Sequence, residues 1–279
     1  MSIMNRILIV EDELNERDGL RALLKSSGFS VEVAVDGMDA LQQIRHQEFD
    51  LLLVDIWMPR MTGLDLLSRL PKNYRTKVVV MTADDTTETL LLALREKAYQ
   101  YITKPFDPKE LLALIRSALE SPPAQDQIQV LSAQPDWVEL RFPCDRQIAE
   151  RIQDVVRHLD SDLPSEVRDS VGLAFHELLM NAIEWGGHMN PNSKVQIAFL
   201  RTERLLLYRI ADPGKGFKPE ELDHAATGHA PDEPCAHTFV REERGLRPGG
   251  FGILLAKSLV DELVYNEAHN EVVMVKYLN

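Results

Sequence analysis

This sequence of 279 residues contains little cysteine, no long apolar run and no excess of basic charge. Its two cysteines, Cys144 and Cys235, support neither a disulfide framework nor a cysteine-rich metal site. This scarcity fits a reducing compartment, so we expect a cytoplasmic protein. The formal net charge of -13 disfavours general binding to nucleic acid or to an anionic membrane, because both require a basic face.

Membrane and export signals are missing as well. No apolar run approaches the roughly 20 residues that a membrane-spanning helix needs. The first residues, MSIMNRILIV, pass directly into a strand-like run without the apolar segment and cleavage site of a signal peptide. We also find no recognisable helix-turn-helix. We therefore expect neither a membrane nor a nucleic acid as a partner.

The length and composition indicate two folded domains. A hydrophobic fraction of 44% and a charged fraction of 27% are those of a globular protein. A chain of 279 residues exceeds one domain of ordinary size. Residues 121–135 contain Ser-Pro-Pro and several Ala, Gln and Asp residues without periodicity, which predicts a linker. The expected domains are therefore residues 4–120 and 136–279.

Short apolar runs alternate with amphipathic stretches in the first half of the chain. This alternation predicts a doubly wound α/β fold, in which helices wrap a five-stranded parallel sheet. The third and fourth runs are apolar throughout, as expected of strands that are buried on both faces. The expected strands lie at residues 7–10, 31–35, 51–54, 78–81 and 101–102.

Acidic, hydroxyl and basic residues stand where four of these runs end. Because sites in open α/β sheets form at the carboxyl ends of strands, we expect these side chains to converge. Neighbouring carboxylates repel one another unless a cation is present, and ligation by oxygen alone suits Mg²⁺. Asp55 could then act as a nucleophile and form an aspartyl phosphate. The residues concerned are Glu11, Asp12, Asp55, Thr82 and Lys104.

Four motifs in this half resemble those of response-regulator receiver domains. They are Ile-Val-Glu-Asp-Glu at 9–13, Asp-Ile-Trp-Met-Pro-Arg-Met-Thr-Gly at 55–63, Met-Thr-Ala at 81–83 and Lys-Pro-Phe at 104–106. The resemblance implies that an upstream histidine kinase phosphorylates Asp55. It also implies a Mg²⁺ site and a phosphoryl-responsive switch. The implied metal site comprises Glu11, Asp12, Asp55 and the carbonyl of Trp57, while Lys104 and Thr82 contact the phosphoryl group and Thr82 and Tyr101 form the switch.

The element order changes after the linker. Strands and separate helices now follow one another in a pattern that predicts a two-layer α+β sandwich rather than a second doubly wound sheet. A long loop at residues 217–246 contains Gly, Pro and His, and we expect it to act as a lid over a ligand. The expected strands are 137–142, 194–200, 205–211 and 271–278, and the expected helices are 145–159, 164–185 and 252–261.

Three segments of this second half suggest a phosphate-bearing ligand. Glu177 and Asn181 lie four residues apart on one helical face, where they can bind a metal-bridged phosphate or simply be solvated. Asp212 begins the turn Asp-Pro-Gly-Lys-Gly-Phe, whose glycines let the backbone approach a ligand closely. Arg-Pro-Gly-Gly-Phe-Gly at 247–252 opens the last helix and can present N–H groups to phosphate.

Two other nucleotide-binding signatures are excluded. A P-loop would need glycine at positions 251 and 256, which are Phe251 and Ala256. The catalytic and metal-binding motifs of protein kinases are also missing.

Taken in order, the three segments resemble the N, G1 and G2 boxes of the GHKL ATP-binding superfamily. The resemblance covers about residues 137–279 and implies that ATP and Mg²⁺ bind here. It implies that Asn181 is a Mg²⁺ ligand, that Asp212 contacts adenine and that Glu177 is a candidate general base. The glycines that it places at the nucleotide are Gly214, Gly216, Gly250 and Gly252.

Within that superfamily the compact layout looks most like the anti-sigma-factor serine kinases. This likeness implies that the protein phosphorylates a serine or threonine of an antagonist protein and also binds a sigma factor. Trp185 and the Arg247-Pro248 pair depart from the family pattern. The short linker before Trp137 leaves no room for the dimerisation hairpin that carries the phosphorylated histidine of a complete sensor histidine kinase. His176 is therefore interpreted as an incidental neighbour of Glu177.

The leading hypothesis is therefore a serine/threonine kinase that is controlled by phosphorylation of Asp55. The alternative is a non-catalytic switch that binds ATP and sequesters a sigma factor or another regulator. The sequence leaves open whether phosphorylation activates or inhibits the output, and whether the chain forms a homodimer.

Overall fold

The computed structural model describes residues 4–278 except 72, 73, 75, 85, 97, 121–127, 135 and 219–250. The chain divides into two compact units, residues 1–127 and 128–279, and each is described by itself. Gly250 and most of the predicted lid loop lie outside the described residues. Among the helices that are described, none is long and apolar enough to cross a membrane.

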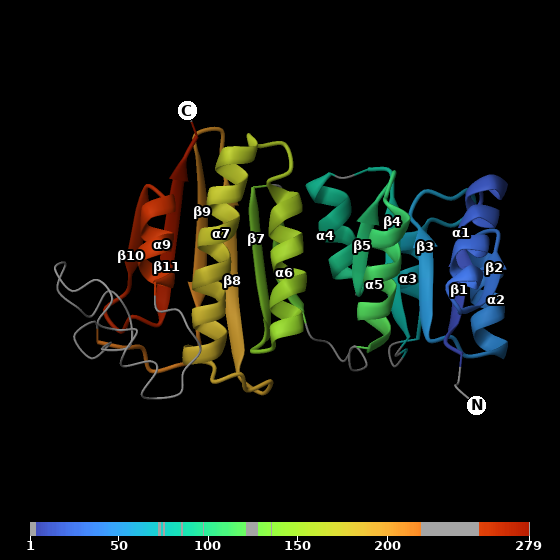
Figure 1. Cartoon of the computed structure of the whole chain (residues 1–279), viewed down its shortest axis with the longest axis horizontal. Coiled ribbons are helices and arrows are strands. Elements are labelled where there is room, and N and C mark those ends of the chain that lie inside the picture. The colour runs from blue at the N-terminus through green and yellow to red at the C-terminus, as the bar shows by residue number, and fades with distance from the viewer. Residues whose placement is uncertain are drawn as a thin grey trace. The chain divides into compact units, whose positions relative to one another are not determined.

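The first unit is a five-stranded sheet in the order β2-β1-β3-β4-β5, and every neighbouring pair is parallel (Figure 1). This arrangement confirms the predicted α/β fold. The strands are β1 (Arg6–Val10), β2 (Ser30–Ala34), β3 (Leu51–Asp55), β4 (Lys77–Thr82) and β5 (Gln100–Thr103), and the helices are α1 (Leu14–Ser26), α2 (Gly37–His46), α3 (Gly63–Arg69), α4 (Thr87–Arg95) and α5 (Pro108–Glu120).

The core of this unit explains the apolar runs. Every residue of β3 and of β4 is buried, as expected where helices cover both faces of a parallel sheet. On one face, Leu24 of α1 and Ile115 of α5 pack with Ile9 and Leu53 of the sheet. In β3 and β4 the polar side chains therefore stand only at the strand ends.

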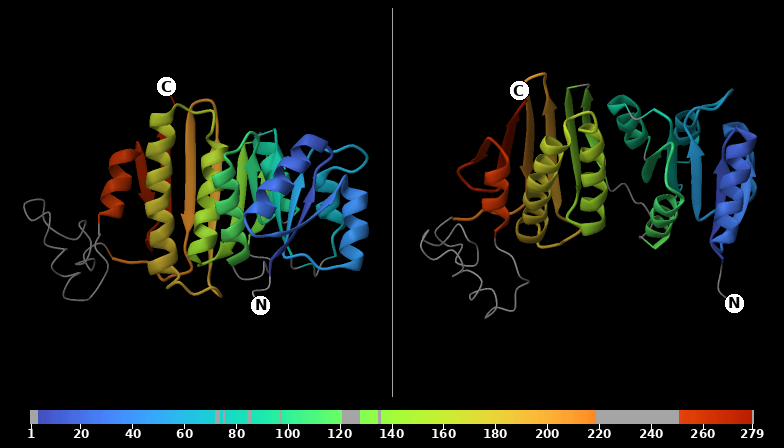
Figure 2. Two further views of the ribbon diagram at one scale, coloured as in Figure 1. Left: turned by 45° about the vertical axis from the view of Figure 1, so that its right-hand side comes forward. Right: turned by 45° about the horizontal axis from the view of Figure 1, so that its top comes forward.

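The second unit is a six-stranded antiparallel sheet in the order β10-β11-β9-β8-β7-β6. Figure 1 and the turned views of Figure 2 show α6, α7 and α9 on the same face of this sheet, which confirms the two-layer α+β prediction. The elements are β6 (Gln129–Gln134), β7 (Trp137–Pro143), α6 (Arg146–Leu159), α7 (Ser165–Asn181), a π-helical turn (Ala182–Gly186), β8 (Lys194–Arg201), β9 (Leu205–Ala211), α9 (Gly252–Leu259), β10 (Glu262–Tyr265) and β11 (Glu271–Tyr277).

The predicted linker at 121–135 extends too far. Residues 129–134 form β6, which pairs with β7 at the edge of the sheet. This edge strand is only partly buried, so its polar and small residues show no clear alternation. The edge strand β10 at the other side of the sheet was not predicted, and it too is exposed or half-buried at every position.

A buried carboxyl group lies in the core of the second unit. Asp160, just after α6, is 2% exposed and accepts a hydrogen bond from the hydroxyl of Tyr208 in β9. The ring of Tyr208 packs against Phe175 and Phe199. Burial raises the pKa of Asp160 to about 6, although the Tyr208 hydroxyl and the charge of Arg201 oppose the rise.

This carboxyl group should make stability depend on pH. The folded state holds the Asp160 proton more tightly than the unfolded chain, whose aspartates titrate near pH 4. The unit should therefore lose stability as pH rises from about 4 to about 6. Asp160→Asn should remove this loss. The free energy of unfolding of the variant, relative to that of wild type, should therefore increase by about 3 kcal/mol between pH 4 and pH 7.

Urea unfolding of both proteins across this pH range measures the effect. Asp169→Asn, at an exposed position of α7, is the matched control and should follow the wild-type curve. A constant difference between Asp160→Asn and wild type at every pH would contradict the prediction.

Candidate functional site

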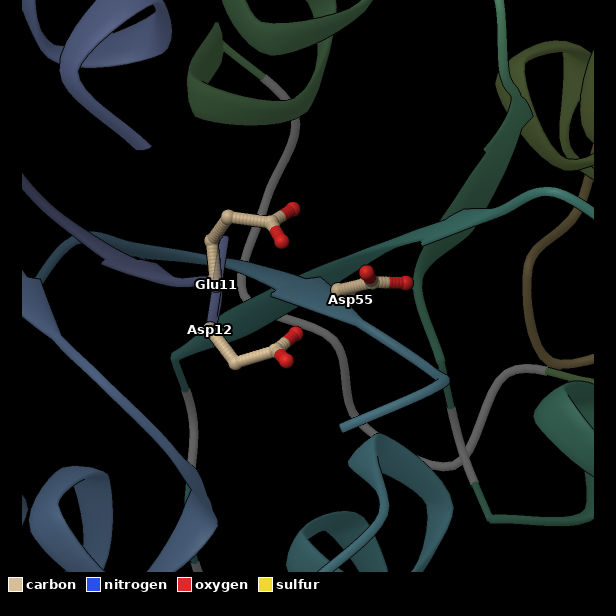
Figure 3. Close-up of side chains that lie close together, drawn as sticks. All are labelled: Glu11, Asp12 and Asp55. Atoms are coloured by element: carbon tan, nitrogen blue, oxygen red, sulfur yellow. The ribbon is translucent and has the colours of Figure 1, made fainter. Parts of the chain in front are cut away.

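Three carboxylates meet at the edge of the first unit where β1 and β3 end. Figure 3 shows Glu11, Asp12 and Asp55 side by side, and an oxygen of each lies within 4.8 Å of the others. Val10 pairs with Val54 in the parallel register, which brings the residues that follow β1 to the level of Asp55. The structure thus brings together the acidic residues predicted from the strand ends. Their all-oxygen donor set suits a hard divalent cation such as Mg²⁺.

Lys104 places its ammonium group among these carboxylates. Its Nζ lies 2.8 Å from Glu11, 2.5 Å from Glu16 and 3.0 Å from Asp55. Burial lowers the pKa of Lys104, but the hydrogen bonds to these three carboxylates outweigh it and raise the pKa overall. Burial also raises the pKa of Glu11, against the hydrogen bond from Lys104. The sequence analysis missed Glu16, because an acidic residue in a first helical turn is common.

The turn after Asp55 is held close to the carboxylates. The N–H of Trp57 donates to Asp55 Oδ1 at 3.3 Å, and the Trp57 side chain is exposed. Gly63, at the start of α3, lies so near that a Cβ would stand 2.3 Å from the carbonyl oxygen of Asp55. Thr62 and Asp65 form a capping box at this helix start, which fixes the end of the turn.

The two expected switch residues lie on neighbouring strands. The hydroxyl of Thr82, at the end of β4, donates to the carbonyl of Asp84 at 2.9 Å and accepts from the Asp84 N–H at 3.0 Å. The Thr82 hydroxyl is therefore hydrogen-bonded to the backbone of the loop that follows β4. The side chain of Tyr101 in β5 is buried, and the residue pairs with Val80 of β4.

In the second unit, Glu177 and Asn181 face the start of α9. A Cβ on Gly252, the first residue of α9, would lie 2.5 Å from Glu177 Oε2 and 3.5 Å from Asn181 Nδ2. The structure thus brings the predicted acidic and amide pair against the end of the predicted phosphate loop. A residue larger than glycine would push the Glu177 carboxylate away.

Asp212 lies just after β9 in a tightly packed turn. Its Oδ1 accepts a hydrogen bond from the Gly214 N–H at 2.7 Å. A Cβ on Gly186, at the end of the π-helical turn, would lie 2.2 Å from Asp212 Cγ, so only glycine fits there. Burial raises the pKa of Asp212, against the Gly214 hydrogen bond. Gly216 follows with a φ of 80°, a conformation that favours glycine.

Two further side chains lie near this carboxylate, and the sequence analysis missed both as members of the site. Burial and the charge of Asp212 raise the pKa of Cys144 to about 11, so this buried thiol stays protonated near neutral pH. The same two causes raise the pKa of Tyr265 to about 12. Cys144 directly follows β7 and Tyr265 ends β10, so no local motif could have revealed them.

Family models match both units. The response regulator receiver domain model matches residues 7–116, and the histidine kinase-like ATPase domain model matches residues 145–276. The chain therefore joins a response regulator receiver domain to a histidine kinase-like ATPase domain.

Similar proteins match the receiver half. The response regulator ArlR of Staphylococcus saprophyticus is 34% identical over 127 residues, which are 46% of this chain and 58% of that protein. ArlR of Staphylococcus aureus is 35% identical over the same shares. The chain thus spans just over half the length of these relatives. A CheY-like receiver domain protein from Methanospirillum hungatei has 33% identity and a TM-score of 0.41, and the match covers 42% of this chain and 94% of that one.

The carboxylate cluster predicts how a divalent cation should bind. Asp12→Asn removes one of three charged oxygen donors, so the Mg²⁺ dissociation constant should rise at least about tenfold, the loss that even an outer-sphere partner can cause. Mg²⁺ titration followed by tryptophan fluorescence measures this, because Trp57 is exposed beside the cluster. Asp18→Asn makes the same change of charge at an exposed position of α1 and should bind Mg²⁺ like wild type. Equal weakening in both variants would show a general charge effect instead.

Proposed function

We propose that this protein is a serine/threonine kinase of the partner-switch kind, whose activity is set by phosphorylation of Asp55. The proposal rests on one observation: the chain carries both an acidic site with Lys104 at 3.0 Å from Asp55 and an ATPase domain in which Glu177 and Asn181 face the start of α9. The first site suits receipt of a phosphoryl group. The second site suits the transfer of a separate phosphoryl group from ATP to another protein.

At the receiver site, a carboxylate oxygen of Asp55 attacks the phosphorus of a phosphohistidine on the upstream kinase. The new bond joins this oxygen to phosphorus, and the bond from phosphorus to the histidine nitrogen breaks. Mg²⁺ held by Glu11, Asp12, Asp55 and the carbonyl of Trp57 would offset the charge on the transferred group. Lys104 keeps its proton and pairs with the phosphoryl oxygens.

The phosphoryl group then acts on the switch residues. Thr82 gives up its hydrogen bonds to Asp84 and turns its hydroxyl toward a phosphoryl oxygen. This movement changes the space beside Tyr101 on the neighbouring strand β5, and the ring repacks. The surface of the receiver domain thereby differs between its two states, which is the input that the ATPase domain or its protein substrate senses.

At the ATPase site, Asp212 accepts a hydrogen bond from the adenine amino group. Gly214 and Gly216 let the backbone approach the nucleotide, and Gly250 and Gly252 present N–H groups to its phosphates. Asn181 would be the protein ligand of the Mg²⁺ that accompanies ATP. Glu177 accepts the proton of a serine or threonine hydroxyl, while the oxygen of that hydroxyl attacks the γ-phosphorus and ADP leaves.

The partners follow from this scheme. An antagonist protein receives the phosphate on serine or threonine. A sigma factor is the second partner, and this chain switches between binding the sigma factor and binding the antagonist. A non-catalytic switch that binds ATP and sequesters such a regulator is the second candidate. It is favoured by the tight position of Glu177 against Gly252, where the carboxylate can serve to hold α9.

Glu177→Gln distinguishes these two functions. Removing a general base should lower the rate of partner phosphorylation by at least about 100-fold, whereas ATP binding should persist. The measurement is Ser/Thr phosphate on copurified proteins, mapped by mass spectrometry after incubation with ATP and Mg²⁺. Glu166→Gln, at an exposed position in the first turn of α7, is the control and should retain the wild-type rate.

Two results would speak against the kinase. Undiminished phosphorylation by Glu177→Gln would show that Glu177 is not the base. No phosphate on any partner with wild-type protein, whether or not Asp55 is phosphorylated, would favour the sequestering switch.

A further inference from the structure

The turn between β10 and β11, residues 266–270, is fastened to the Asp212 segment at three points. The N–H of Asp212 donates to the carbonyl of Asn270 at 2.9 Å. The side-chain amide of Asn270 donates to the carbonyl of Gly214 at 2.9 Å. Farther along, the N–H of Phe217 donates to the carbonyl of Ala268 at 3.2 Å. One short turn therefore holds the whole segment from 212 to 217.

The side chain of Asn270 is itself held in one orientation. Asn266 Nδ2 donates to Asn270 Oδ1 at 2.8 Å, and the Asn270 N–H donates to Asn266 Oδ1 at 3.1 Å. Because Oδ1 of Asn270 is occupied as an acceptor, its Nδ2 is the atom that faces Gly214. The direction of this donor is thus set by the turn.

Packing reinforces these hydrogen bonds. Gly216 lies so close to the turn that a Cβ would stand 1.5 Å from the carbonyl oxygen of Ala268. The ring of Phe217 lies 5.1 Å from that of His269 and 5.7 Å from that of Tyr265. The rings of Tyr265 and His269 stack on each other at 5.5 Å. The turn at 266–270 and the segment at 212–217 are therefore packed closely against each other.

We propose that Asn270 is a positioning residue for recognition of the adenine base, an inference that rests on the proposed role of Asp212. The Gly214 N–H fixes Oδ1 of Asp212, and Asn270 fixes the carbonyl of the same glycine. Asn270 also holds the Asp212 backbone through its own carbonyl. These bonds aim the second carboxylate oxygen of Asp212, Oδ2, at the place where an exocyclic amino group would donate.

Comparison of ATP with inosine triphosphate tests this inference in the full-length protein. Inosine triphosphate carries the same phosphates and lacks the exocyclic amino group. Wild type should bind ATP more tightly. Asn270→Ala and Asn270→Asp should each weaken ATP binding about tenfold, as expected for a misdirected hydrogen bond, and leave inosine triphosphate binding nearly unchanged. Asn270→Asp keeps the shape and the acceptor for Asn266 but presents an oxygen to the carbonyl of Gly214.

The controls separate this inference from the proposed function. Asp212→Asn should abolish the preference for ATP, and Asn192→Ala, at an exposed loop position, should keep it. An Asn270 variant that keeps the preference while Asp212→Asn loses it would overturn the positioning role alone. Equal weakening of both nucleotides, with a lowered melting temperature, would overturn it in favour of a general structural role. An Asp212→Asn variant that keeps the preference would overturn the adenine contact, and this inference with it.

Discussion

One ammonium group and the carboxylates around it govern the receiver site. Glu11 and Asp55 are buried next to each other, and two neighbouring negative charges that lose their water would strongly oppose folding. Lys104 lies within 3.0 Å of both and of the more exposed Glu16, so it offsets this repulsion before any metal or phosphoryl group arrives. In the proposed function, Lys104 pairs from this same position with a phosphoryl group on Asp55, 3.0 Å away.

The proposed ATP site depends on a comparable constraint, but close backbone contacts supply it. Asp212 is held from one side by the close approach of Gly186 and from the other by the turn that contains Asn270. Glu177 and Asn181 lie close to Gly252 at the start of α9, where a Cβ would meet the Glu177 carboxylate. Both sites therefore combine carboxylates with closely packed glycines, since a Cβ on Gly63 would clash with the backbone of Asp55 and a Cβ on Gly186 with the side chain of Asp212.

The sequence predicted the site best where polar residues directly follow buried strands. The parallel fold and the convergence of Glu11, Asp12 and Asp55 follow from apolar runs that end in acidic residues. The edge strands β6 and β10 were missed because partly buried edges lack a clear hydrophobic pattern. Glu16 and Asn270 were missed for another reason: their contacts join positions 88 and 56 residues apart, so only the folded register reveals them.

The central claim is that the state of Asp55 controls phosphoryl transfer at the ATPase domain. The most direct measurement is the rate of Ser/Thr phosphorylation of a copurified partner, with and without a small-molecule phosphoryl donor for Asp55. The account predicts that the donor changes this rate in wild type and leaves it unchanged in Asp55→Asn. An identical rate in wild type before and after verified phosphorylation of Asp55 would contradict the account.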